Sequence, residues 1–72
     1  MYTQAQFDAE FKANDLQTIA QQYERDGIPD RPARREAYNN KMDAYHREGL
    51  ISDDAVNEWF ISDSLETTLY WL

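Results

Sequence analysis

The chain has 72 residues, with fourteen acidic side chains against seven basic ones and a net charge of −7. It contains no cysteine, which excludes disulfides, thiolate metal sites and a cysteine nucleophile. Its apolar content of 42% is too high for a disordered acidic tail, and no apolar run reaches the roughly 20 residues of a membrane span. No signal-peptide pattern opens it. We therefore expect a single domain over residues 1–72 that is soluble, cytoplasmic and not associated with a membrane.

The first twenty-five residues contain two helix signals in succession. Thr3 and Gln6 have the spacing of a capping box, which predicts a helix over about residues 4–13. Asn14 is expected to end this helix, and Asp15 to cap a second one over about residues 16–25. The second helix is predicted from an apolar stripe formed by Leu16, Ile19, Ala20 and Tyr23.

A long third helix is predicted between two glycines. Gly27 supplies the left-handed residue that commonly ends a helix, and Asp30 is a good N-cap for the helix that follows. Pro32 is tolerated in its first turn, and the helix is expected to reach Glu48 and to stop at Gly49. Its predicted inward stripe consists of Ala37, Tyr38, Met42 and Tyr45.

The last third of the chain predicts one short helix and an ambiguous end. Ser52 is an N-cap residue for a helix over about residues 53–61, and Ser62 either breaks that helix or caps another. Residues 65–72 fit either a helix or a strand, and we favour a helix because no partner strand is evident. The predicted fold class is therefore all-α, a small single-domain bundle of four to five short helices.

The negative charge is concentrated in residues 50–72, which hold five acidic side chains and no basic one. The same segment carries several aromatic residues. Acids around aromatic side chains are what a protein-binding surface requires, because the aromatics desolvate and the charges steer a basic partner. The alternative is that the apolar residues Val56, Trp59, Phe60, Leu65 and Leu69 form half of the core and the acids form its solvated outer side. On the first interpretation, the candidate partner-binding residues are Asp53, Asp54, Glu58, Trp59, Asp63, Glu66, Tyr70 and Trp71.

Catalytic and metal-binding patterns are weak in this sequence. His46 is the sole histidine, and no carboxylate partner that would orient it is evident from the sequence. Asp53, Asp54 and Glu58 lack the loop spacing and central glycine of a calcium site. We therefore expect neither an enzyme nor a cofactor or metal site.

Three arginines, Arg31, Arg34 and Arg35, cluster at the start of the third predicted helix, where the helix dipole disfavours positive charge. They either pair with Asp26, Asp30 or the acidic C-terminal third, or they contact a small anion or RNA. The net charge argues against direct nucleic-acid binding.

Residues 35–59 resemble a stretch found in short open reading frames of tailed bacteriophages. The matching elements are Arg35-Glu36-Ala37-Tyr38-Asn39-Asn40, Asp43, Gly49, Ile51-Ser52 and Asn57-Glu58-Trp59, whereas Lys41-Met42 stands where a second aromatic residue is expected. The resemblance implies a phage origin and carries no motif tied to chemistry. Small acidic phage proteins are similar in size and charge to inhibitors of host defence, such as anti-CRISPR and anti-restriction proteins.

Two function hypotheses follow. The first is a non-enzymatic viral protein that acts as a nucleic-acid mimic and binds a host protein with a basic surface in the host cytoplasm, which it inhibits or redirects. The second is a self-associating structural module, a homodimer in which residues 69–72 dock onto a second copy.

Overall fold

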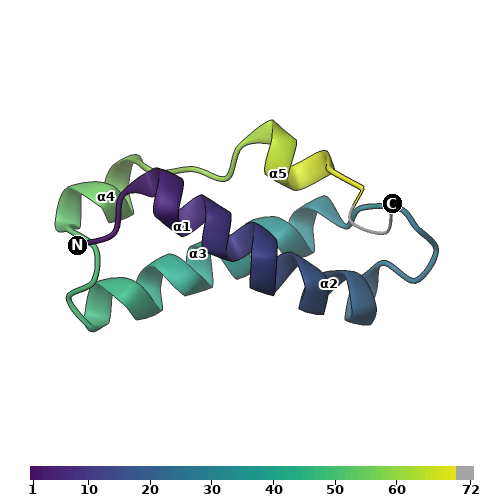
Figure 1. Cartoon of the computed structure of the whole chain (residues 1–72), viewed down its shortest axis with the longest axis horizontal. Helices are drawn as coiled ribbons and strands as arrows, with labels where there is room; N and C mark the ends of the chain where they lie inside the picture. The colour runs from purple at the N-terminus through teal and green to yellow at the C-terminus, as the bar shows by residue number, and fades with distance from the viewer. Residues whose placement is uncertain (70–72) are drawn as a thin grey trace.

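Two long helical segments lie side by side, and two short helices pack against them (Figure 1). The computed structural model describes residues 1–69. Within them the helices are α1 (Gln4–Glu10), η1 (Phe11–Asp15), α2 (Leu16–Tyr23), α3 (Arg31–Arg47), α4 (Asp53–Glu58) and α5 (Asp63–Thr67). The first segment comprises α1, η1 and α2 without interruption, and the second is α3. The described residues contain no strand, so the predicted all-α fold class is confirmed.

The predicted helix break at Asn14 and Asp15 is wrong, because the chain continues there as a π-helical turn. Asp15 has helical dihedral angles, φ −75° and ψ −39°, and its side chain caps nothing. The N–H of Leu16 donates to the carbonyl of Phe11, five residues back. A π turn accommodates one residue more than an α turn, so Phe11 and Leu16 both lie in the core with no exposed surface. The apolar stripe therefore shifts by one residue between Phe11 and Leu16, and the helix continues without a break.

Four helices begin at the residues predicted to cap them. Each cap side chain accepts a hydrogen bond from the backbone N–H three residues further on, and these caps are Thr3, Asp30, Ser52 and Ser62. Gln6 also accepts from the N–H of Thr3, which completes the capping box. Gly27 and Gly49 have φ values of +81° and +74°, so both predicted left-handed positions are confirmed.

The C-terminal third differs most from the prediction. Helix α4 ends at Glu58 rather than near Ile61, because Trp59 is extended with φ −83° and ψ 134°. A new helix, α5, starts after Ser62 and ends at Thr67, so of the helix predicted over 65–72 only residues 65–67 are helical within the described chain. Residues 70–72 lie outside the described part of the chain.

One apolar core is shared by the helices and by the α3–α4 connection. Tyr38 is central to it, since its ring makes edge-on contacts with Phe7 and Phe11 at centroid distances of 5.0 and 5.3 Å. The predicted inward stripe of α3 is confirmed for Tyr38 and Met42, while Ala37 and Tyr45 are only partly buried. Three predicted core residues are instead exposed, namely Tyr23, Phe60 and Leu69.

Candidate protein-interaction surface

Arg34 is the central residue of the arginine cluster, and it has no exposed surface. Its Nε and Nη2 donate to the two carboxylate oxygens of Glu24 at 2.8 and 2.7 Å, which forms a bidentate pair. Its Nη1 donates to the carbonyl oxygens of Leu65 and Thr68 at 3.0 and 2.9 Å. One side chain of α3 therefore joins the end of α2 to α5 and the residue after it.

Glu24 is almost as buried, with 1% of its surface exposed. Burial alone would raise the pKa of Glu24, but the hydrogen bonds from Arg34 and from the N–H of Asp30 outweigh it and hold that pKa below its ordinary value. Because Glu24 binds the guanidinium and the Asp30 backbone together, it also fixes the loop between α2 and α3. The sequence contains no local spacing rule that relates Glu24 to Arg34, which is why this pair was not predicted.

The other two arginines bind acidic residues of α5. Arg35 Nη2 lies 2.8 Å from Glu66, and Arg31 Nη2 lies 3.2 Å from Glu66 and 3.6 Å from Asp63. The hydrogen bond from Arg35 lowers the pKa of Glu66, and the contact with Arg31 adds to this shift against the opposing effect of burial. Glu66 is only 6% exposed and so is not part of an exposed acidic surface, in contrast to Asp63.

These contacts pair all three arginines within the chain. Of the two interpretations that the sequence left open, the structure favours internal pairing. Arg31 and Arg35 pair with the acidic C-terminal third, whereas Arg34 pairs with Glu24, which was not among the predicted partners. The positive charge at the start of α3 is compensated by Glu24, Asp63 and Glu66.

The carboxylates of α4 differ from those of α5 in having no lysine or arginine partner within residues 1–69. Asp53, Asp54 and Glu58 are all exposed, and no lysine or arginine among residues 1–69 lies within ion-pair distance of them. Asp53 and Asp54 occupy the first turn of α4, where the helix dipole favours negative charge. The three residues are thus exposed on α4, and this helix lies at one end of the molecule (Figure 1).

His46 does have a carboxylate neighbour, contrary to the reading of the sequence. Its Nε2 lies 2.5 Å from Asp53 Oδ1 and joins the end of α3 to the start of α4. Asp53 is seven residues further along the chain, beyond the Gly49 turn, so helical spacing could not reveal this pair. Both side chains are solvent-accessible, at 39% and 89%.

The two neighbouring aromatic residues after α4 have opposite environments. Trp59 is partly buried against the core, with its ring 5.7 Å from that of Phe7. Phe60 is 73% exposed, and its carbonyl oxygen accepts a hydrogen bond from Gln4 Nε2 at 3.4 Å. The exposed aromatic residue is therefore Phe60 rather than the predicted Trp59, since the chain is extended here and adjacent side chains point in opposite directions. Tyr70 and Trp71 lie outside the described residues. We call Asp53, Asp54, Glu58 and Phe60 the α4 surface.

A further polar network holds the π-helical turn. Lys41 of α3 lies 3.0 Å from Glu10 and 2.9 Å from Asp15, with its ammonium 4.7 Å from the centre of the Tyr45 ring. Burial opposes the charge on Lys41, but the hydrogen bonds with Asp15 and Glu10 outweigh it and raise the pKa of Lys41. Glu10 also accepts a hydrogen bond from the Tyr45 hydroxyl, which lowers the pKa of Glu10. This network joins α3 to the π-helical turn and so has a structural role.

Comparison of the chain with protein-family models, curated proteins and solved structures finds no match. No helix within residues 1–69 is long and apolar enough to cross a membrane. In the same residues, no three histidine, aspartate or glutamate side chains are grouped as metal ligands would be.

Proposed function

We propose that this chain is a protein-binding module that uses the α4 surface to bind a basic surface of a partner protein. The observation that carries this proposal is the 73% exposure of Phe60, which follows α4 by two residues, together with three exposed carboxylates of α4 that have no lysine or arginine partner in the described chain. Within residues 1–69, Phe60 is one of five exposed large apolar residues, and it is the one that lies just after the acidic helix α4.

The two parts of the α4 surface have different tasks in such a complex. Burying the Phe60 side chain against a partner contributes roughly 1.5–3 kcal/mol. Asp53, Asp54 and Glu58 add negative charge on α4, which accelerates association with a basic surface and sets its orientation. This is the arrangement of an apolar hot spot with a charged rim.

The chemistry of the α4 surface fits host proteins that handle nucleic acids, because such proteins present clustered lysine and arginine to phosphates. Occupation of that cluster by carboxylates would exclude the nucleic acid. The resemblance of residues 35–59 to phage reading frames supports the same class, a counter-defence inhibitor of the anti-CRISPR or anti-restriction kind.

The test is capture of a partner from bacterial lysate by the immobilised chain and by matched variants. Asp53→Asn with Asp54→Asn and Glu58→Gln removes three charges from the α4 surface, and Phe60→Ser removes its aromatic side chain. A control with Asp26→Asn, Asp43→Asn and Glu48→Gln removes three exposed charges elsewhere. We expect the wild type and the control to retain the same partner, and both α4 variants to lose it. Equal capture by all four proteins would refute the proposal.

Self-association is the second candidate function, and the 48% exposure of Leu69 favours it. A dimer formed through this end of the chain requires a molecular mass that rises with concentration. Sedimentation measurements across the micromolar range test this, and a constant mass of 8.5 kDa would refute it.

A further inference from the structure

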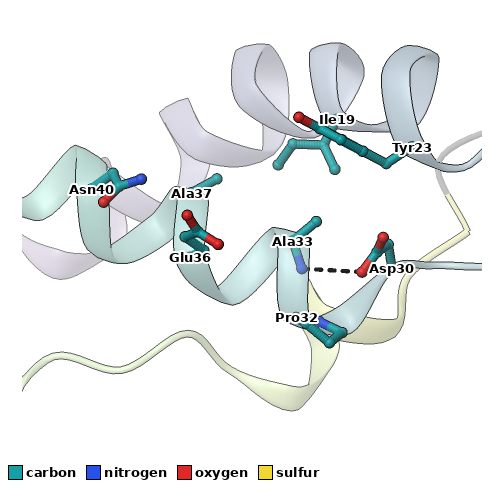
Figure 2. Close-up of a pocket in the computed structure, with 8 residues that line it drawn as sticks. All are labelled: Ile19, Tyr23, Asp30, Pro32, Ala33, Glu36, Ala37 and Asn40. Atoms are coloured by element: carbon teal, nitrogen blue, oxygen red, sulfur yellow. Dashed lines mark hydrogen bonds between the residues drawn. The ribbon is translucent and has the colours of Figure 1, made fainter.

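A hollow of about 380 Å³ lies between α2 and α3, at the opposite end of the molecule from α4 (Figures 1 and 2). Figure 2 shows Ile19 and Tyr23 on α2 facing Ala33 and Ala37 on α3. Because the side chains of Ala33 and Ala37 are short, they leave space between α2 and α3. The volume is at the lower end of the range of ligand pockets, roughly 300–1,000 Å³, and suits a single side chain.

The end of this groove between Tyr23 and Asp30 is held by hydrogen bonds of the α2–α3 loop. Tyr23 is the last residue of α2 and Asp30 is the N-cap of α3. Glu24, which follows Tyr23, accepts hydrogen bonds from both Arg34 and the N–H of Asp30. The buried Arg34–Glu24 pair thus fixes both walls of the groove, while the Tyr23 side chain is left 61% exposed. An aromatic side chain on a fixed scaffold loses little conformational entropy when a partner covers it.

The groove combines apolar and acidic groups and includes no basic one among its lining residues. Asp30 and Glu36 contribute carboxylates from α3. Glu36 is exposed and forms no ion pair within residues 1–69, and only Oδ1 of Asp30 is used by the helix cap. The charge of the lining therefore complements a cation with an apolar stem.

We propose that this groove binds an arginine side chain of a partner protein. Its aliphatic stem packs on Ile19, Ala33 and Ala37, and its guanidinium lies between the Tyr23 ring and the α3 carboxylates. A planar guanidinium stacks on an aromatic ring and pairs with a carboxylate at the same time, which a lysine ammonium does less well. This site shares no residue with the α4 surface, so it goes beyond the function proposed above and does not depend on it.

The experiment is an NMR titration of the full ¹⁵N-labelled chain with N-acetyl-arginine methylamide as the probe. We expect saturable shifts at the amides of Tyr23, Ala33 and Ala37. Glu36→Gln and Tyr23→Leu should each lower the affinity for the probe by about fivefold or more, since each removes one favourable interaction with the guanidinium. Tyr23→Phe should keep the affinity because it keeps the ring.

Matched controls make the result decisive. Asp43→Asn removes one charge from the same helix, two turns beyond Glu36, and should leave the affinity unchanged. The variant with Asp53, Asp54 and Glu58 neutralised should also bind the probe normally, which separates this site from the α4 surface. Equal affinity for the lysine or norleucine analogue would overturn the assignment to arginine. Non-saturable shifts spread over the acidic residues, or equal weakening by Asp43→Asn and Glu36→Gln, would overturn the site.

Discussion

Replacement of Arg34 by methionine tests whether the buried ion pair with Glu24 holds the helices together. The substitution keeps an unbranched apolar side chain but removes four hydrogen bonds, two to Glu24 and one each to the carbonyls of Leu65 and Thr68. It leaves the Glu24 carboxylate buried without its charged partner. We expect this unpaired buried charge to be the largest contribution to the loss of stability.

The magnitude follows from the burial of both partners. Removing one member of a buried pair costs about 3–5 kcal/mol of unfolding free energy. Chains of this length have a total stability of about 4–11 kcal/mol, so Arg34→Met should lose a large part of it. At roughly 4–8 °C per kcal/mol for a domain of this size, the melting temperature should fall by about 12 °C or more.

Thermal and urea unfolding followed by far-UV circular dichroism measures this loss. Arg25→Met is the matched control, since Arg25 is exposed, and its effect should stay within about 0.5 kcal/mol. The double variant Arg34→Met with Glu24→Met removes the stranded carboxylate and should regain part of the stability. A loss below about 1 kcal/mol for Arg34→Met, or a double variant less stable than the single one, would refute the reasoning.

Two further predictions concern the π turn and the acidic residues. Deleting Asn14 should convert η1 to an ordinary α turn and leave the chain folded. Deleting Asn40, which is also exposed, should rotate the rest of α3 by about 100° and unfold the chain. Thermal unfolding of both deletion variants tests this, and an equal loss of stability in the two would contradict it. Stability should also fall in acid, because the folded-state pKa values of Glu10, Glu24 and Glu66 are lowered from 4.5. The contribution of these carboxylates is complete above that pH and is lost as the pH falls through the folded-state values. Urea unfolding between pH 7 and pH 3 measures this loss. The double variant Glu10→Gln with Glu66→Gln should show a shallower dependence of unfolding free energy on pH. An equally steep dependence would contradict the assigned ion pairs of Glu10 and Glu66.

The candidate site was only partly predictable from the sequence. The exposed carboxylates Asp53 and Asp54 follow from their place in the first turn of a short, capped helix, of which Glu58 is the last residue. The exposed aromatic residue did not follow, because whether Trp59 or Phe60 faces the core depends on the extended backbone after α4. Glu66 has the same charge as the α4 acids, but α3 places two arginines against it.

The sequence by itself determined where α1, α3 and α4 start and that the chain turns at Gly27 and Gly49. Caps such as Thr3 and Ser52 and the left-handed Gly49 act within a few residues, so their effects can be read locally. Only the tertiary structure decided which polar groups are buried. Glu24 and Arg34 meet because the α2–α3 loop folds back and α5 covers the pair. The helix continues through Asp15 because packing against α3 keeps its apolar stripe in register. Burial and long-range pairing depend on which elements meet, and spacing along one chain segment does not contain that information.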